Sequence, residues 1–427
     1  MSYGTGFQAM MAYWERLQPV NAVHAAQCTA VIAPAELASA VGRLFRKFHA
    51  SAEGRTSSAC SFLSREPDPN AAVCPEVAVL KTAADLDGLL TQQMNRRFDA
   101  DEFPIRIGLA QAPGAVWVWI CYRHLIADAR SIALLTQHLL EEVNGGRTAD
   151  LNLRLEFSVD GVRHFFPEEC RRRHWPWLAA RSLRTLWQLQ RCCRPKPAQA
   201  DDFRTTCLVH AQRLPLQQLR ETAARHAATV GELLTASIVA WNFEHDRRSP
   251  TRWRRRDRCV SVLTDLTLRT RLSRRDVFGQ WIAPINVFVP FRDCSGLSDI
   301  IPTVRRSLRD VQSVSGQLAA LQGLTLNSRL VRLLPRWLAH RDQEFLFPVC
   351  AAVSNVNLTR LLAPPRVPLS VQSYVRATCA TQFAPAIVCL TTHDGLCSVT
   401  STHRDSVYGQ ADMRRLGQHV VQQLFGT

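Results

Sequence analysis

The sequence predicts an α+β protein with two lobes, each a mixed sheet with its own helices. Helical periodicity and short apolar strand patterns alternate in both halves of the 427 residues. From 167 to 200 the pattern changes to tryptophan, arginine and proline, which indicates a link between the halves. The 46% hydrophobic composition is enough for two cores. We therefore predict an N-terminal lobe at 1–170, a basic Trp-rich linker at 171–200 and a C-terminal lobe at 201–427.

In the first half, an apolar run at 28–32 predicts a strand, and Pro34 stands at a plausible helix start. A helical pattern follows at 86–94, and alternation at 105–109 predicts a half-buried strand. Residues 116–122 are apolar throughout, so we expect this strand to be covered on both faces.

The second half is predicted to open with helices, one of which begins at a capping box formed by Thr229 and Glu232. The strands that we expect in this half lie at 259–263, 285–289, 349–353, 387–391 and 397–402, with helices at 301–311 and 411–424.

His124 follows the apolar strand at 116–122, where the chain turns into a helix, and among thirteen histidines it alone has Asp four residues later, at Asp128. Transfer of an acyl group from a thioester to an amine or hydroxyl needs a group that takes the acceptor's proton, and imidazole suits this near neutral pH. Taken alone, the pattern is more typical of a structural histidine and of an aspartate that caps a helix ahead of Ser131. The residues by themselves leave both interpretations open.

Residues 103–140 resemble the condensation domains of nonribosomal peptide synthetases and their polyketide-associated and wax-ester-type relatives, in the chloramphenicol-acetyltransferase-like superfamily. The string Phe-Pro-Ile-Arg-Ile at 103–107 is similar to the family's Pro-Leu-Arg strand, and 123–129 occupy its HHxxxDG motif. The resemblance continues at 269–291, at 353–355 and at 391–396, so it covers nearly the whole chain.

This resemblance implies two lobes that form a V around a central tunnel, with His124 as the catalytic residue midway. It also implies a structural Asp128 salt-bridged to Arg269. Weaker candidates for the tunnel wall or for contacts to the oxyanion are Gly279, Asn286, Ser354 and Asn355.

Two residues depart from the family motif. Arg123 replaces its first histidine, and we expect this cation to lie beside the site and to lower the pKa of His124. Ala129 replaces the motif glycine, and its methyl group could narrow the donor channel. These departures keep open a second hypothesis, a catalytically silent module that binds a carrier protein.

The formal net charge of +16 favours anionic partners. The resemblance implies a donor that is a phosphopantetheine thioester, carried by an acidic acyl or peptidyl carrier protein or by CoA, and a small amine or alcohol acceptor. We expect no permanently bound cofactor. The cysteines show no CxxC pair, so we expect reduced thiols in a cytoplasmic protein and no metal site. The length matches one free-standing domain, so we expect the donor to arrive from elsewhere.

Arginine is concentrated at 171–194 and at 252–258. The segment 175–194 could be a basic amphipathic helix on a membrane surface, with Leu178, Leu183, Leu186 and Trp187 inserted, which would favour a wax-ester or lipid acceptor. The alternative is a crossover helix packed between the lobes. Nucleic-acid binding has only the charge in its favour, and we do not expect it.

Overall fold

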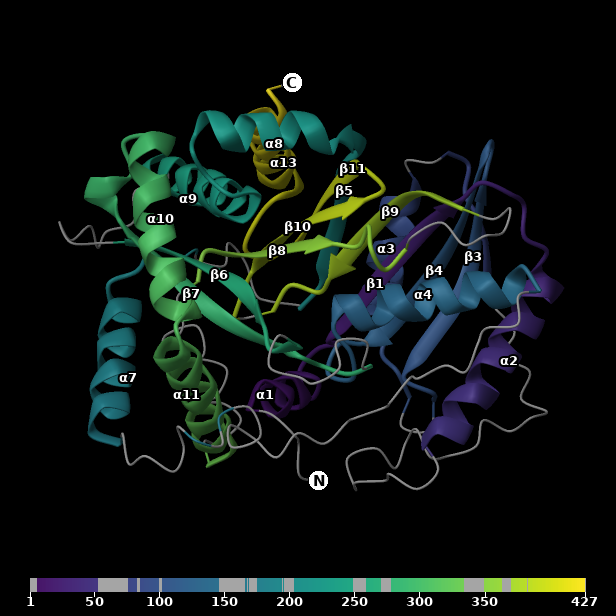
Figure 1. Ribbon diagram of the computed structural model, residues 1–427, viewed down its shortest axis with the longest axis horizontal. Coiled ribbons are helices and arrows are strands. Elements are labelled where there is room, and N and C mark those ends of the chain that lie inside the picture. The colour runs from purple at the N-terminus through teal and green to yellow at the C-terminus, as the bar shows by residue number, and fades with distance from the viewer. Residues whose placement is uncertain are drawn as a thin grey trace.

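The structure is a computed structural model with two mixed sheets and their covering helices (Figure 1). The residues that it describes are 6–52, 76–82, 85–99, 102–145, 166, 168, 175–193, 195, 203–248, 259–269, 278–333, 349–362, 370–381 and 383–426. The predicted α+β class with a mixed sheet in each lobe is confirmed.

The first sheet has five strands in the order β2-β3-β4-β1-β9, of which only β2 and β3 are parallel neighbours. Its strands are β1 (Asn21–Cys28), β2 (Glu76–Val79), β3 (Ile105–Ala112), β4 (Ala115–Arg123) and β9 (Val371–Thr378). Helices α2 (Pro34–Ala52) and α4 (Ala129–Val143) pack on one face, and α3 (Leu86–Asn95) packs on the other.

Strand β4 is buried on both faces, as its uninterrupted apolar sequence predicts. Val118 and Ile120 face the core under α2 and α4, whereas Trp117 and Trp119 face α3. The next residues after this strand are the motif residues, so a rigid, fully packed element sets their position.

The second sheet has six strands in the order β5-β11-β10-β8-β6-β7, with β8 parallel to both of its neighbours. Its strands are β5 (Thr205–Pro215), β6 (Cys259–Thr267), β7 (Ile282–Pro290), β8 (Ala351–Asn357), β10 (Ala386–His393) and β11 (Leu396–Arg404). The helices of this lobe are α8 (Leu216–Arg225), α9 (Val230–Arg248), η4 (Phe291–Asp293), α10 (Leu297–Gln312), α11 (Val314–Leu333) and α13 (Gln410–Phe425).

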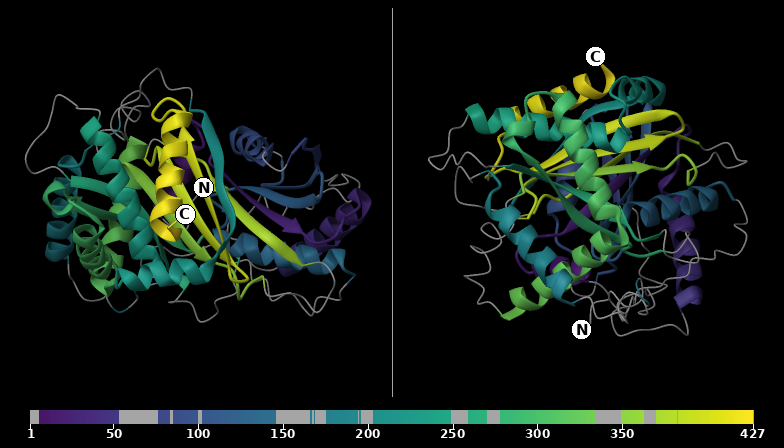
Figure 2. Two further views of the ribbon diagram at one scale, coloured as in Figure 1. Left: turned by 90° about the horizontal axis from the view of Figure 1, so that it is seen from above. Right: turned by 60° about the vertical axis from the view of Figure 1, so that its left-hand side comes forward.

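Two segments join the lobes. Strand β9 comes from the second half of the chain but pairs with β1 of the first sheet, so the two sheets do not separate at one point of the sequence. Helix α1 (Gly6–Trp14), at the start of the chain, packs on α11 of the other lobe. A Cβ at Gly6 would lie 2.5 Å from the backbone nitrogen of Thr325, so this close approach requires glycine. Figure 2 shows the two lobes side by side from above.

Two predictions about strands are wrong. The strand placed at 28–32 is β1, which ends at Cys28 and carries the polar His24 in its centre. The second half opens with β5 and not with a helix. Strand β5 lies at a sheet edge, and its sequence mixes polar and apolar residues without a regular alternation. Strand β1 places its polar His24 in a tertiary contact with Tyr374. The other predicted helices and strands are present.

The predicted capping box at the start of α9 is confirmed. The backbone N–H of Thr229 donates to the Glu232 carboxylate at 2.9 Å, and the backbone N–H of Glu232 donates to the Thr229 hydroxyl at 3.2 Å. Arg305 of α10 also donates to Glu232, at 3.1 Å, so the cap fixes α9 against α10.

Helix α7 (Trp175–Gln190) lies at the outer edge of the C-terminal lobe beside α11, so its predicted position between the lobes is wrong (Figure 1). Arg181 pairs with Asp310 of α10 at 2.7 Å. Leu183 and Trp187 are 66% and 58% exposed, and Arg191 stacks on the Trp187 ring. The side chains of Leu178 and Leu186 and the arginine run at 252–258 lie outside the described residues.

The chain after α7 is held to the second sheet through two cysteine pairs. The Sγ atoms of Cys192 and Cys259 are 3.2 Å apart, and those of Cys193 and Cys350 are 3.3 Å apart. The cysteines that the structure describes are all buried free thiols. Within these described residues no cluster of His, Cys, Asp and Glu could hold a metal ion, and no helix has the length and apolarity to cross a bilayer.

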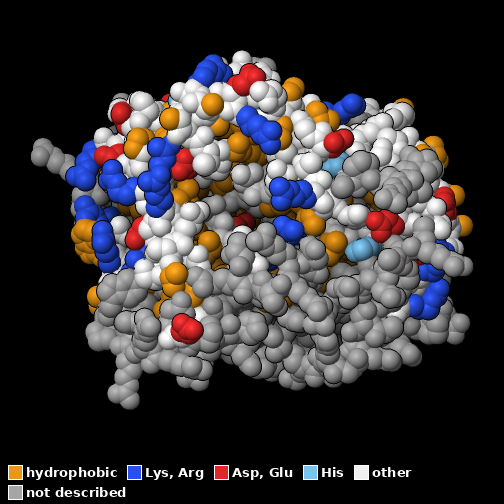
Figure 3. Space-filling model, in the orientation of Figure 1, with side chains coloured by type: hydrophobic (Ala, Val, Ile, Leu, Met, Phe, Trp, Pro, Cys, Tyr) orange, Lys and Arg blue, Asp and Glu red, His pale blue; other side chains and the backbone are white. Residues whose placement is uncertain are grey.

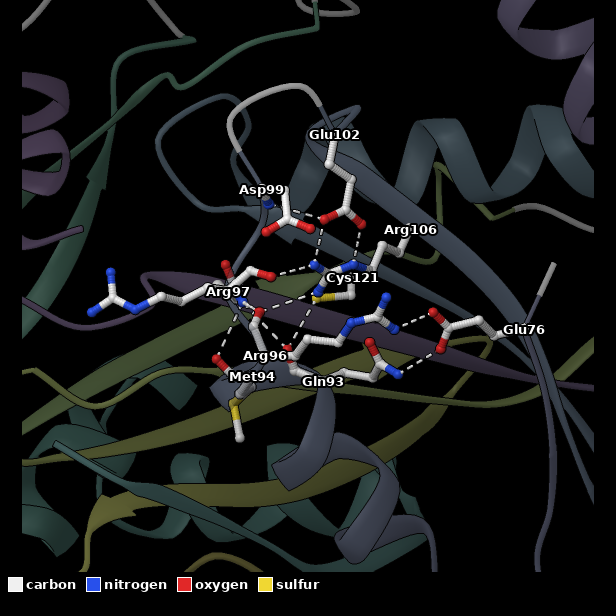
Figure 4. Close-up of polar contacts among 10 residues, drawn as sticks. Glu76, Gln93, Met94, Arg96, Arg97, Asp99, Glu102, Arg106 and Cys121 are labelled. Carbon is white, nitrogen blue, oxygen red and sulfur yellow. Dashed lines mark hydrogen bonds and ion pairs between the residues drawn. The ribbon is translucent and has the colours of Figure 1, made fainter. Parts of the chain in front are cut away.

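Arg106, the arginine of the predicted Pro-Leu-Arg strand, closes the loop between α3 and β3 (Figure 4). Its guanidinium donates to the Glu102 carboxylate at 2.7 Å and to the Arg96 carbonyl at 3.1 Å, and it stacks on the Phe98 ring at 3.9 Å. Arg106 therefore stabilises the first sheet at a distance from the motif histidine.

Acid is expected to destabilise the fold through its buried histidines. Burial lowers the pKa of His210 from 6.5 to about 4, and the neutral ring lies 2.7 Å from the Ser401 hydroxyl. Between these two pH values the unfolded chain binds a proton that the folded chain does not, so stability falls as pH drops from 6.5 towards 4. The loss due to His210 is on the order of 3 kcal/mol.

Urea unfolding at pH 7.5, 6.5, 5.5 and 4.5 measures this effect, with His210→Gln as the comparison. The difference in unfolding free energy between wild type and variant isolates His210 from carboxyls that titrate in the same range, such as Asp87, whose pKa burial raises to about 6. A difference that stays constant over the whole pH range would contradict the prediction.

Candidate active site

A cavity of about 430 Å³ lies between the two lobes, with walls from both. The N-terminal lobe contributes α1, the end of β4 and the start of α4, and the C-terminal lobe contributes α9, β6, β7 and β8. Strand β9 contributes Arg376 and Thr378. The cavity joins residues that are far apart in the chain, and His124 lines it.

The turn after β4 fixes the imidazole of His124. Its backbone N–H donates to the Val20 carbonyl at 2.8 Å, and the Gln280 amide donates to its backbone carbonyl at 2.8 Å. Its ring nitrogen Nδ1 lies 3.2 Å from the Ala127 carbonyl. The Gln280 amide nitrogen, which can only donate, is farther from Nδ1, at 3.5 Å, and makes its shorter hydrogen bond to the His124 carbonyl. A carbonyl oxygen can only accept, so the closer contact with Ala127 places the hydrogen on Nδ1 and the lone pair on Nε2. Among the described residues, Nε2 has no hydrogen-bond partner.

Burial lowers the pKa of His124, and the positive charge of Arg376 lowers it further. The Ala127 carbonyl and the charge of Asp128 act in the opposite direction. At neutral pH the ring is therefore neutral, with the tautomer that a general base requires.

Asp128 and Arg269 form the ion pair that the resemblance implies. The guanidinium donates to both carboxylate oxygens, at 3.1 Å from Nε and 2.7 Å from Nη2, and the two residues are 2% and 4% exposed. Asp128 is also the N-cap of α4, because its carboxylate accepts from the backbone N–H of Ser131 at 2.9 Å. The Asp128 side chain thus both caps α4 and pairs with Arg269.

Gly279 lies behind the motif turn. Its backbone N–H donates to the Ser131 hydroxyl, and its carbonyl accepts both from that hydroxyl and from the backbone N–H of Asp128, all at 2.9 to 3.0 Å. Its φ of 152° favours glycine. Gly279 ties the loop before β7 to the start of α4 and is not part of the cavity wall, so its predicted place in the tunnel is wrong.

Arg123 does not act as predicted. Its guanidinium pairs with the Glu15 carboxylate, 3.1 Å from Nε, and it does not line the cavity. The cation that lowers the pKa of His124 is Arg376. Asn286 is also outside the cavity wall, where its side-chain oxygen accepts from Ser261 at 3.3 Å. Of the other candidates, Ala129, Ser354 and Asn355 line the cavity.

Sequence reasoning missed Arg376, which is 2% exposed and makes four hydrogen bonds. It donates to the Thr391 hydroxyl at 2.9 Å, to the Ser354 hydroxyl at 3.3 Å and to the carbonyls of Ser354 and Leu390 at 3.2 Å. These hydrogen bonds are charge-assisted and hold the guanidinium at all three of its nitrogens, so Arg376 is a fixed positive charge in the wall. The sequence did contain one indication of a buried charge, because Arg376 stands between the apolar residues Val375 and Ala377.

A buried histidine, His24 of β1, lies behind the motif and was also missed. Its Nδ1 is 2.7 Å from the Tyr374 hydroxyl, and its ring packs edge-on against Tyr122. Tyr122 in turn packs edge-on against His124. Burial holds the pKa of His24 well below 6.5, so this aromatic support is uncharged.

No family model matches the chain, and no curated protein matches it either. Among solved structures, a trichothecene 15-O-acetyltransferase from Fusarium sporotrichioides superposes with a TM-score of 0.67 at 12% identity, over 99% of this chain and 94% of that one. The starter condensation domain of rhizomide synthetase, a mutant in complex with C8-CoA and Leu-SNAC, gives 0.59 at 12% identity, over 99% and 94%. The X-domain in its complex with OxyB from teicoplanin biosynthesis gives 0.58 at 13% identity, over 99% and 92%.

These similarities extend over almost the full length of each protein, and they agree with the two mixed sheets and the cavity between them. The chain therefore has the two-lobed fold of the condensation domains and chloramphenicol-acetyltransferase-like acyltransferases.

Proposed function

We propose that this protein is an acyltransferase of secondary metabolism that moves an acyl group from a thioester to an amine or hydroxyl, with His124 as general base. The observation that carries the proposal is the state of His124 in the cavity between the lobes: Nδ1 is held by the Ala127 carbonyl, and Nε2 keeps its lone pair. The fold alone would not suffice, because one fold supports many functions.

In the proposed reaction, Nε2 of His124 takes the proton of the acceptor as its nitrogen or oxygen attacks the thioester carbonyl. The tetrahedral intermediate then expels the thiolate, which takes up the proton from the imidazole. Products are the amide or ester and the free thiol. Arg376, with its positive charge fixed in the same wall, favours the negative charge that develops on the oxygen. Ser354 and Asn355 are proposed to contribute hydrogen bonds in the same wall.

Asp128 and Arg269 are proposed to position the turn that carries His124 and to take no part in the transfer of the acceptor's proton. Both carboxylate oxygens of Asp128 are used by Arg269 and by backbone N–H groups of Ser131 and Trp281. The pair joins α4 of one lobe to the end of β6 in the other, and so holds the turn that carries His124.

The donor is proposed to be anionic, either acyl-CoA or an acyl group on the phosphopantetheine arm of an acidic carrier protein. The neighbour bound to C8-CoA and Leu-SNAC is consistent with a thioester donor of either kind. Lys and Arg side chains gather on the face over α9 and α10 (Figure 3), and Arg306 and Arg309 of α10 are exposed there. Such a surface attracts phosphates and acidic proteins.

The test uses the purified chain with a panel of acyl-CoA donors and acyl carrier proteins, offered with primary amines and alcohols. Release of free thiol and intact mass spectrometry of the carrier proteins report transfer. We expect thiol release that requires both the protein and an acceptor. Thiol release at the uncatalysed rate with every donor and acceptor pair would overturn the proposal.

A partner-binding module without catalysis is the second candidate, and the similarity to an X-domain in complex with OxyB favours it. The two candidates separate on His124, because a pure binding module has no need of its imidazole. Equal capture of a carrier protein by wild type and His124→Ala, together with no turnover by either, would favour the module.

A further inference from the structure

Asp265 is a carboxylate on the cavity wall that the reaction above does not use. It lies on β6 of the C-terminal lobe, opposite Pro284 in β7, and its side chain is accessible from the cavity. On the same strand, Leu263, Thr264 and Thr267 also line the cavity.

We propose that Asp265 selects acceptors that carry a positive charge, by pairing with an ammonium group of the acceptor inside the cavity. This inference rests on the proposed acyltransferase function and names the substrate class that its acceptor side takes. Asp265 would act as a specificity-determining residue, while His124 carries the proton transfer.

The first argument is that Asp265 makes no ion pair among the described residues. The nearby cation, Arg376, directs its donors to Thr391, Ser354 and Leu390 and gives none to Asp265. Among the described residues, the Ser354 hydroxyl is the side-chain donor near the Asp265 carboxylate. A carboxylate has about four acceptor positions, so most of its capacity is open towards the cavity.

The second argument is electrostatic. The cavity walls surround the side chain, although it remains exposed to solvent in the cavity. The surrounding protein raises the pKa of Asp265 to about 6, with Arg376 opposing the rise and Asp128 adding to it. A ligand that fills the cavity displaces water from this carboxylate, and a cationic group compensates for the lost hydration by pairing with it. A neutral ligand would displace the same water without supplying that partner.

The third argument is the distribution of polarity along the cavity. The wall near Asp265 continues with polar residues of β6 and β8, among them Thr267, Asn355 and Asn357. The wall from α1 is apolar, with Met11 and Trp14. A substrate with a charged end and an apolar remainder fits this arrangement, with the charge at the C-terminal lobe.

The decisive experiment compares two isosteric acceptors, (2-hydroxyethyl)trimethylammonium and 3,3-dimethylbutan-1-ol. Both carry a hydroxyl as the nucleophile and differ in charge, because only the first has a permanent positive charge at its other end. We expect wild type to favour the cationic acceptor in kcat/KM, and Asp265→Asn to reduce that preference by about 10- to 100-fold. Asp394→Asn, the same change at an exposed carboxylate that does not line the cavity, is the matched control and should retain the wild-type ratio.

Calorimetric titration of both alcohols in the absence of donor gives the same comparison without turnover. A higher Kd for the cationic alcohol in Asp265→Asn, with little difference for the neutral alcohol, supports the inference even if no acyl transfer occurs. If the proposed function is wrong but the inference is right, the protein shows charge-selective binding and no turnover. The inference is overturned if wild type binds and acylates the two alcohols alike, or if Asp265→Asn affects both equally.

Discussion

Replacement of His124 by alanine is expected to lower kcat for acyl transfer by about 10²- to 10⁴-fold, the usual contribution of a general base. Nε2 of this ring is the proposed proton acceptor, and the ring lines the cavity, so its loss removes chemistry without leaving a void in a packed core. Steady-state assays of thiol release with the best donor and acceptor pair measure the effect.

The matched control is His138→Ala, because His138 is a partly buried histidine of α4 that lies beside Glu141 and does not line the cavity. Circular dichroism spectra of both variants should match wild type. Retention of more than a tenth of wild-type kcat in His124→Ala would refute the assignment.

The pH dependence of the wild type follows from the same residue. Because burial and Arg376 lower the pKa of His124 below 6.5, its neutral form persists in mildly acidic solution. The acidic limb of kcat against pH should therefore have its midpoint below 6.5. That limb should be absent from the residual rate of His124→Ala.

Arg269→Met is expected to lower the unfolding free energy by about 3 to 5 kcal/mol, the cost of leaving one member of a buried ion pair unpaired. The Asp128 carboxylate would retain its backbone donors from Ser131 and Trp281 but lose two charge-assisted hydrogen bonds. Equilibrium unfolding in guanidinium, followed by circular dichroism, measures the loss.

A double-mutant cycle shows whether the loss comes from the unpaired charge. The double variant with Asp128→Asn and Arg269→Met has no buried charge left at this place, so we expect it to be less destabilised than the sum of the single variants. Strict additivity, or a loss below about 1 kcal/mol in Arg269→Met, would show that the pair contributes little.

The helices and the central strand β4 could be predicted because their signals are local. Hydrophobic periodicity and the Thr229 capping box need only neighbouring residues, and so they were identified correctly. Strands β1 and β9 carry His24 and Arg376 in their centres, and these polar groups are tolerated only because distant residues satisfy them. No local pattern predicts such contacts.

The residues of the candidate site also differ in whether a local pattern could predict them. His124 and Asp128 are four residues apart and form a motif, whereas Asp265 and Arg376 reach the cavity from other strands. Gln280 holds the His124 backbone from the loop before β7. The expected effect of Arg123 on the pKa of His124 was wrong because Arg123 pairs with Glu15, on the turn after α1. Only the tertiary structure brings these two residues together. A sequence can name the residue types that a site needs, but here the fold decides which charges face the imidazole.

Strand β9 makes the first lobe depend on the second. Residues 371 to 378 complete the sheet that begins at Asn21, so an emerging polypeptide cannot finish its N-terminal layer until almost the entire chain has been synthesised. Long-range pairing of this kind slows folding, because the long chain between β1 and β9 must be brought together, at a cost in entropy, before the pairing stabilises the sheet. The same strand brings Arg376 to the cavity, so the positive charge beside the imidazole is in place only once β9 has paired with β1.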